Sequence, residues 1–442
     1  MTTEFIGNNG SRYGLIKELG SGGQGYVYKV KCLNSGIERA LKWYHSTTST
    51  QEQKERLNKL IQEGTPVSGV DGIEFIWPLE LVTHPDSPGF GYVMPLIDTR
   101  QYVELNSIII GKKKQPSQKK LCRLSSLLCV AMESVHQKGM AYCDINLGNI
   151  MFDPDNAKMI ICDNDNVVVN NADVAILGVL EFMAPEVALN ESLPNAQSDL
   201  YSIAILLYQL WMWEHPMDGK ITFEKAVCWD IPSKLKRFAR EPLFVHHPTD
   251  NSNSAQGIPM LELSLKRWGI CPPVLKQAFT KVFTEGIKNK EKRLRLSDWQ
   301  RIFLELESDA VTCPCGAGNL IDISSSVRTC FHCRSSLEPV LILNSKFPGG
   351  TSHLVVHTNG ELRRHHVEYS PSNREALDVI GIIKEHPQKK GVHGIGNNSR
   401  DTWYYQHNGQ TFPIEPGQAR PLIPGATIKI GQSTLTVDCL PE

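Results

Sequence analysis

The chain has 442 residues, enough for about three domains of ordinary size. Hydrophobic residues make up 41% and charged residues 21%, a composition that excludes a disordered tail protein and a fibre. Lys and Arg number 46 against 47 Asp and Glu, so the net charge of −1 gives no overall electrostatic basis for binding nucleic acid or an anionic membrane. We therefore expect neither nucleic acid nor a membrane among the partners.

The cysteines are unevenly distributed. Eight of the twelve are scattered singly, whereas Cys313, Cys315, Cys330 and Cys333 fall within 21 positions. This pattern favours a reducing compartment with one metal site over a disulfide framework. The longest apolar run, residues 203–213, is far shorter than the roughly 20 residues that span a bilayer. With no basic segment after the first methionine, we expect a cytoplasmic protein.

In chain order, residues 12–98 are typical of β-hairpins around one helix. Leu57, Leu60 and Ile61 have the spacing of one helical face and predict a helix over residues 51–63. After a lysine-rich loop, strong apolar faces predict helices over residues 121–138 and 199–213.

The residue pattern of the sequence changes at two points further along the chain. Short cysteine-bearing turns begin at residue 310, and alternating strands follow residue 339, with one helix expected near residues 372–384. We expect a multidomain chain with boundaries at 1–308, 309–337 and 338–442.

A glycine-rich turn joins two of the first predicted strands. Residues 20–27, Gly-Ser-Gly-Gly-Gln-Gly-Tyr-Val, fit the pattern G-x-G-x-x-G-x-V, in which glycines let backbone amides approach phosphates. By itself the pattern fits a glycine-rich hairpin equally well, and the following strand excludes a dinucleotide-binding fold. Lys42 ends a strand fifteen residues after Val27 and is a candidate for contacting phosphates.

The most informative string is residues 142–149, Tyr-Cys-Asp-Ile-Asn-Leu-Gly-Asn, followed by an apolar strand and Asp163. Asp144, Asn149 and Asp163 supply a proton acceptor and two oxygen ligands. Phosphoryl transfer with Mg²⁺ requires these groups.

These motifs resemble the protein-kinase catalytic domain, specifically the eukaryotic-like (Hanks-type) kinases of bacteria. The resemblance covers residues 12 to about 305 and implies an α+β bilobal fold, with an N-lobe of about 12–98 and a C-lobe of about 99–308. It also implies phosphorylation of Ser or Thr of a protein with ATP and Mg²⁺ or Mn²⁺. The further matching motifs are Phe182 to Glu186, Ser198 to Ile203, His215 to Gly219, and Arg293.

The resemblance also implies residue roles. Lys42 holds ATP phosphates and pairs with a helix glutamate, for which Glu63 is the first choice and Glu55 the second. Asp144 orients the acceptor hydroxyl, while Asn149 and Asp163 hold Mg²⁺. The implied nucleotide site comprises Gly20, Gly22, Gly25, Val27, Ala40, Lys42, Glu63, Met94, Leu96, Asn149 and Asp163.

Three structural roles follow from the same resemblance. Met94 lies at the back of the adenine pocket, and residues 95–97 form the hinge. Glu186 and Arg293 form a buried ion pair, and Asp199 binds the backbone around Tyr142.

Several positions depart from the kinase pattern. Cys143 replaces the usual arginine, Asn146 a lysine and Val179 a threonine, while Asn164 and Asp165 replace phenylalanine and glycine. Residues 164–183 contain no Ser, Thr or Tyr, which excludes activation by phosphorylation within this segment.

The departures leave two interpretations open. The retained Lys42, Asp144, Asn149 and Asp163 favour an active protein serine/threonine kinase, whereas Asn146, Val179 and Asn164 favour a pseudokinase scaffold that binds nucleotide and partners. A small-molecule phosphotransferase of the aminoglycoside type is disfavoured by residues 184–186, Ala-Pro-Glu.

The four clustered cysteines form two tight pairs 14 residues apart and resemble a zinc ribbon. Four thiolates can surround one tetrahedral structural Zn²⁺, and the segment is too short to fold around its own core. His332 is the substitute ligand if Cys315 points away.

Residues 338–442 resemble a β-sandwich of the forkhead-associated type, because short strands alternate with Asn-Gly and Pro-Gly turns. The phosphothreonine-binding arginine of that family has no counterpart in residues 341–357, which favours a protein-interaction sandwich. Residues 363–366, Arg-Arg-His-His, fit a solvated turn better than an anion site. The three-part order resembles bacterial kinases encoded beside a von Willebrand A-domain protein and a metal-dependent protein phosphatase, which are the implied partners.

Overall fold

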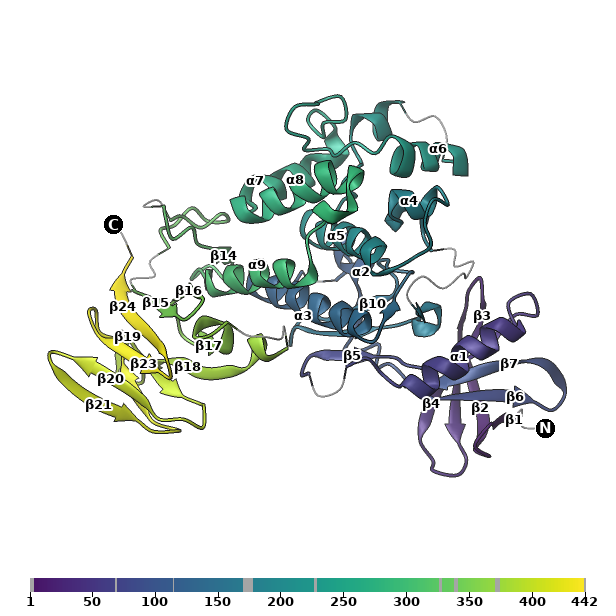
Figure 1. The fold of residues 1–442 in the computed structure, drawn as a ribbon, viewed down its shortest axis with the longest axis horizontal. Coiled ribbons are helices and arrows are strands. Elements are labelled where there is room, and N and C mark those ends of the chain that lie inside the picture. The colour runs from purple at the N-terminus through teal and green to yellow at the C-terminus, as the bar shows by residue number, and fades with distance from the viewer. Residues whose placement is uncertain are drawn as a thin grey trace. The chain divides into compact units, whose positions relative to one another are not determined.

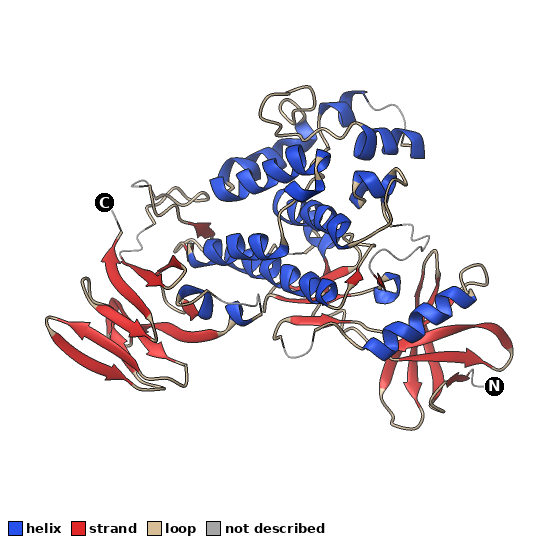
Figure 2. Ribbon diagram, in the orientation of Figure 1, coloured by secondary structure: helices blue, strands red, loops and turns tan. Residues whose placement is uncertain are grey.

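The computed structural model describes residues 4–67, 70–113, 115–169, 178–225, 229–325, 328–337, 341–369 and 374–440. It divides into two compact units. The first contains residues 1–115, 131–269 and 277–294, and the second contains residues 116–130, 270–276 and 295–442. Helices are concentrated in the middle of the sequence, and strands dominate the N-terminal and C-terminal parts (Figure 2). In the described part of the chain, no helix has the length and apolar character needed to cross a membrane.

The first unit begins with a closed barrel of strand order β1-β2-β3-β4-β7-β6. Its strands are β1 (Glu4–Gly7), β2 (Arg12–Ser21), β3 (Gly25–Cys32), β4 (Glu38–Tyr44), β6 (Glu80–His84) and β7 (Ser87–Met94).

Helix α1 (Gln51–Glu63) lies beside this barrel, near β4 and β7 (Figure 1). Its bounds coincide with the sequence prediction. Thr50 caps its first turn by accepting a hydrogen bond from the amide of Gln53. The apolar face of α1 packs through Leu57 against Tyr44, Leu81 and Tyr92 of the barrel, so burial of this face holds the helix against the strands.

Smaller sheets and helices complete the first unit. One sheet has the order β5-β11-β10-β8 and another pairs β12 with β9. These strands are β5 (Ile73–Phe75), β8 (Val103–Glu104), β9 (Met140–Ala141), β10 (Ile150–Asp153), β11 (Lys158–Ile161) and β12 (Val168–Val169). The helices are α2 (Leu105–Ile109), α4 (Pro185–Ala188), α5 (Ala196–Met212) and α6 (Ile231–Leu235), while α3 (Gln118–Gln137), α7 (Glu262–Ile270) and α8 (Pro273–Lys288) each span residues of both units.

The second unit contains α9 (Leu296–Ser308), a short cysteine-bearing hairpin and two larger sheets. The sheets have the orders β16-β15-β24-β23-β20-β21 and β17-β18-β19-β22 and share one core around Trp403 and Ile383. The hairpin is β13 (Ala310–Thr312) and β14 (Gly318–Leu320). The sheet strands are β15 (Leu341–Phe347), β16 (Gly350–Val355), β17 (Glu361–Arg363), β18 (Val379–His386), β19 (Lys389–Asn397), β20 (Trp403–His407), β21 (Gln410–Ile414), β22 (Ala419–Pro421), β23 (Thr427–Ile430) and β24 (Ser433–Cys439).

Two sequence predictions in this unit are wrong. The helix expected near residues 372–384 is a short 3-10 turn, Glu375–Leu377, followed by strand β18, and positions 372–373 lie outside the described residues. Residues 379–383, Val-Ile-Gly-Ile-Ile, are rich in β-branched side chains, which favour a strand. The solvated turn expected at residues 363–366 is also wrong for Arg363 and His366, because both side chains are buried.

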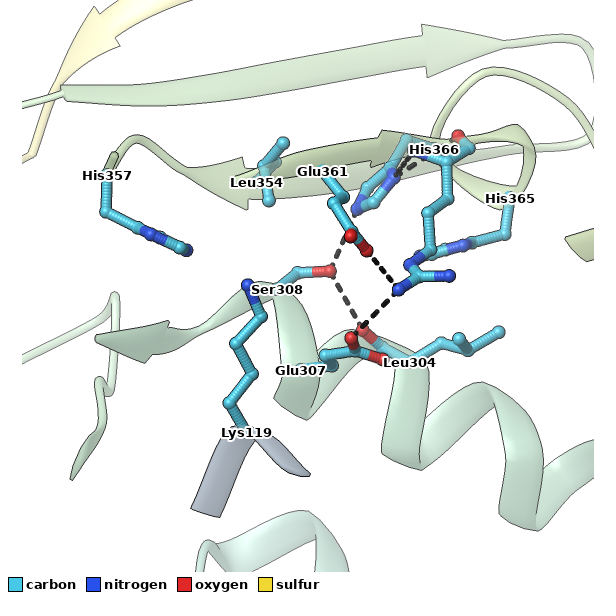
Figure 3. Close-up of a pocket in the computed structure, with 10 residues that line it drawn as sticks. Lys119, Leu304, Glu307, Ser308, Leu354, His357, Glu361, His365 and His366 are labelled. Carbon is cyan, nitrogen blue, oxygen red and sulfur yellow. Dashed lines mark hydrogen bonds and ion pairs between the residues drawn. The ribbon is translucent and has the colours of Figure 1, made fainter. Parts of the chain in front are cut away.

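The buried side chains of that turn join α9 to the sheets (Figure 3). A guanidinium nitrogen of Arg363 is 3.1 Å from Glu307 of α9 and also contacts Glu361. An imidazole nitrogen of His366 lies 2.8 Å from the hydroxyl of Ser308. The cavity among these side chains measures about 10 Å³, room for about one water molecule. These contacts explain why α9 belongs to the second compact unit, although the predicted boundary near residue 308 would assign it to the first.

Arg363→Ala should destabilise the second unit by about 3–5 kcal/mol, because it leaves the carboxylate of Glu307 buried without its cation. Arg364→Ala is the matched control, since that side chain is 41% exposed and its ion pairs contribute at most about 1 kcal/mol. Calorimetry of the full chain measures both effects. Equal stability of the two variants would contradict the buried ion pair.

Candidate active site

The glycine-rich turn and Lys42 lie on adjacent strands of the barrel. Val27 of β3 is directly opposite Lys42 of β4. A side chain at Gly25 would meet the carbonyl oxygen of Trp43 at 2.1 Å, so this position requires glycine for the strands to approach. Gly20 and Gly22 are exposed, which leaves their backbone open to a ligand.

The predicted adenine-site residues come from the same strands. Ala40 of β4 pairs with Met94 at the end of β7, and Leu96 lies two residues after Met94. Ala40 is buried, whereas Val27, Met94 and Leu96 are each partly exposed. The barrel therefore presents a small apolar group beside the segment predicted as the hinge.

The ammonium group of Lys42 is buried and makes three kinds of contact. It donates to Asp163 at 2.7 Å and to both oxygens of Asp165 at 2.9 and 3.1 Å. It also donates to the side-chain oxygen of Gln24, in the glycine-rich turn, at 2.7 Å. The attraction of the two aspartates raises the pKa of Lys42 although burial lowers it, so the lysine is charged.

The expected pairing of Lys42 with Glu63, or with Glu55, is not the one formed. Both glutamates lie on exposed positions of α1 and line an open cavity of about 560 Å³. The backbone carbonyl of Glu63 accepts a hydrogen bond from Lys138 at 2.7 Å. The physical reason is the helical face, because α1 buries Gln53, Leu57 and Leu60 and turns its glutamates away.

The two aspartates after β11 have different environments. Asp163 adopts a left-handed backbone conformation with φ of 53°, and its side chain remains 39% exposed. Asp165 is fully buried. Burial and the neighbouring Asp165 raise the pKa of Asp163 to about 6 against the opposing effect of Lys42. Burial also raises the pKa of Asp165, but Lys42 and Tyr44 outweigh it and lower that pKa. Asp163 is therefore the carboxylate with an open side for a cation.

Three asparagines surround the carboxylate of Asp144. Asn146 donates to it at 3.0 Å, Asn166 at 3.1 Å and Asn149 at 3.3 Å. Asn149 also donates to the backbone carbonyl of Asp144 at 2.7 Å. Because the amide nitrogen of Asn149 faces Asp144, its amide oxygen is the atom left for a cation.

A continuous series of hydrogen bonds connects Lys42 to Asp144. Gln24 accepts from Lys42 and donates to the side-chain oxygen of Asn166 at 3.2 Å. Asn166 in turn donates to Asp144. The predicted phosphate-binding lysine, proton acceptor and metal ligands thus meet in one place.

Two structural predictions around the site are confirmed. Asp199 accepts hydrogen bonds from the backbone amide of Tyr142 at 2.7 Å and from that of Cys143 at 3.2 Å. Arg293 binds Glu186 through both guanidinium nitrogens at 2.7 and 2.8 Å. The bidentate pair and the buried carboxylate fix the segments before and after the site.

Sequence reasoning missed Gln24, Tyr44, Gln53 and Asn166 and assigned no lysine-binding role to Asp165. The one signal available was the acidic residue two positions after Asp163. Asn164 itself is fully buried and donates to the backbone carbonyls of Ile76 and Ile161. The kinase pattern has phenylalanine at this position. In this chain the amide of Asn164 hydrogen-bonds to the backbone instead.

The four clustered cysteines form a separate group in the second unit. Their sulfur atoms all lie within 4.8 Å of one another. The Cys313–Cys333 and Cys315–Cys330 sulfur distances are 3.6 and 3.8 Å, and a Zn–S bond of about 2.3 Å in a tetrahedron sets sulfurs about 3.8 Å apart. Burial raises the pKa of Cys330, but backbone amides of Cys333 and His332 lower it to about 6, which favours a thiolate. The donor set and spacing fit zinc, and Cys315 belongs to the group, so the substitute His332 is not required.

The model of the protein kinase domain matches residues 13–267, more than half of the chain. The chain therefore belongs to the protein kinase domain family.

The curated relatives that the chain resembles include kinases with serine/threonine in their names. The chain is 23% identical to serine/threonine-protein kinase PLK4 of Nematostella vectensis over 54% of this chain and 25% of that protein. It is 32% identical to PknB of Mycobacterium tuberculosis over 21% of this chain and 15% of that protein. It is 24% identical to the probable kinase CPE1738 of Clostridium perfringens over 49% of this chain and 31% of that protein. The chain thus spans less than a third of the length of each relative.

Proposed function

We propose that the chain transfers the γ-phosphoryl group of ATP to Ser or Thr of a protein partner. The observation that supports this most is the hydrogen-bonded series from Lys42 through Gln24 and Asn166 to Asp144. It gathers a cation, a carboxylate base and two oxygen ligands within one site. The match to the protein kinase family agrees with this chemistry.

In this proposal each side chain has one task. Asp144, held by three amides, orients the acceptor hydroxyl and receives its proton. Lys42 binds the phosphates, and Asn149 and Asp163 offer oxygen ligands to Mg²⁺ or Mn²⁺. When bound, the metal neutralises charge that develops on the phosphate oxygens. Asn146 supplies a neutral donor to Asp144 where the family pattern has a lysine.

We also propose that Cys313, Cys315, Cys330 and Cys333 bind one structural zinc within a ribbon at residues 309–337, and that residues 338–442 are a forkhead-associated-like sandwich that binds protein. Four protein ligands leave no open position for catalysis. By the resemblance noted in the sequence, a von Willebrand A-domain protein and a metal-dependent phosphatase are proposed partners.

Asp163→Ala should lower phosphoryl transfer at least about 100-fold, because removal of a metal ligand forfeits several kcal/mol of charge stabilisation. The assay follows transfer of labelled γ-phosphate from Mg-ATP to casein and to the chain itself. Asp155→Ala is the matched control, since it removes an exposed carboxylate from the turn between β10 and β11. Wild-type turnover in Asp163→Ala would contradict the assignment, and nucleotide binding without any transfer by the wild type would support a scaffold.

Phosphatase-treated protein should retain its transfer activity, since residues 164–183 contain no hydroxyl to phosphorylate. Mass spectrometry confirms complete dephosphorylation before the assay. Loss of activity after that treatment would show that a phosphate elsewhere in the chain is required.

Metal analysis of freshly purified protein should find one zinc per chain, and Cys330→Ser should lose it. Because the hairpin buries few apolar side chains, loss of the metal should expose residues 309–337 to protease. Cys439→Ser, which changes an exposed free cysteine, is the control. Protein without zinc, or an unchanged digestion pattern after chelation, would leave four reduced thiols.

A further inference from the structure

Of the two aspartates that bind Lys42, Asp165 makes the more extensive contact. Both of its carboxylate oxygens accept from the ammonium group, at 2.9 and 3.1 Å, whereas Asp163 offers one oxygen. The side chain of Lys42 is 7% exposed and that of Asp165 is fully buried. A buried cation of this kind requires a carboxylate that stays in place.

The environment of Asp165 suits it to this task and not to binding metal. Its Oδ2 atom also accepts a short hydrogen bond from the hydroxyl of Tyr44. With both oxygens already hydrogen-bonded and no exposed surface, Asp165 is closed to a metal ion. Asp163 has the exposed side. Asp165 is therefore suited to holding the lysine, and Asp163 is suited to binding a metal.

Helix α1 reaches this pair through neutral groups. The side-chain amide of Gln53, on the buried face of α1, donates to the hydroxyl of Tyr44 at 2.9 Å. Tyr44 in turn donates to Asp165. The amide oxygen of Gln53 accepts from Arg56 of the same helix. The glutamates of α1 lie away from this series of contacts, on exposed positions.

We propose that Asp165 is the positioning residue for Lys42, in place of a glutamate on α1, and that Tyr44 and Gln53 connect α1 to it. This inference rests on the proposed phosphoryl transfer, since it assigns Lys42 to ATP phosphates. When Mg²⁺ engages Asp163, Asp165 keeps the lysine anchored. Without Asp165, Asp163 is the one carboxylate left to the lysine among its present partners, and the lysine competes with the metal for it.

The test compares Asp165→Asn with Glu63→Gln and Glu55→Gln, which remove the same charge from α1. Three quantities are measured in the full chain: the affinity for Mg-ADP by calorimetry, kcat and KM for ATP, and the Mg²⁺ concentration that gives half-maximal transfer. Asp165→Asn should lower kcat/KM at least tenfold and raise the half-maximal Mg²⁺ concentration. Both glutamate variants should match the wild type. The change in Mg²⁺ requirement separates positioning from a general loss of structure.

Tyr44→Phe removes only one hydroxyl and should shift the same quantities in the same direction by a smaller factor. It decides the test if thermal unfolding shows that Asp165→Asn is not folded. Wild-type values in both Asp165→Asn and Tyr44→Phe, or a tenfold loss in a glutamate variant, would overturn the inference. If the wild type binds Mg-ADP but transfers no phosphate, the proposed function fails. In that case the inference is still supported if Asp165→Asn binds Mg-ADP more weakly and the glutamate variants bind it as the wild type does.

Discussion

A buried cation is costly unless it is paired and hydrogen-bonded, and Lys42 is paired with Asp163 and Asp165. The lysine lies within barrel strand β4, whereas the aspartates lie more than a hundred positions later, after β11. The ion pairs therefore join two distant parts of the sequence within the first unit. Gln24, which binds the same ammonium group, brings the glycine-rich turn to the same place.

Amide groups supply much of the remaining organisation of the site. Asn146, Asn149 and Asn166 donate to Asp144, and Asn164 donates to the backbone carbonyls of Ile76 and Ile161. Neutral amides hold a carboxylate in a fixed orientation without cancelling its charge. In the proposed reaction, Asp144 is thus a well-oriented base even without the lysine of the kinase pattern. The missing lysine weakens the electrostatic stabilisation of the phosphoryl group in that reaction.

Helix α1 and the glycine, lysine and carboxylate positions of the site can be predicted from the sequence, because each is marked by a motif of short, fixed spacing. Helix α1, the Asp199 contact with the backbone of Tyr142 and the Glu186–Arg293 ion pair were all accessible in this way. The carboxylate that pairs with Lys42 could not be predicted in this way. The position of a glutamate relative to a motif does not show which face of its helix is buried. Gln53 precedes Leu57 by four positions and Leu60 by seven, so it shares their buried face. Glu63 stands at the last position of α1 and is exposed. The burial of Arg363 depends on Glu307, 56 positions away, which no local pattern reveals.

The most direct measurement is an experimental structure of the full chain with Mg²⁺ and a non-hydrolysable ATP analogue. We expect Asp163 on the metal, with Lys42 hydrogen-bonded both to Asp165 and to a phosphate oxygen. Tyr44 and Gln53 should keep their hydrogen bonds. A lysine paired with Glu63 or Glu55 of α1, or Asp165 on the metal, would contradict this account.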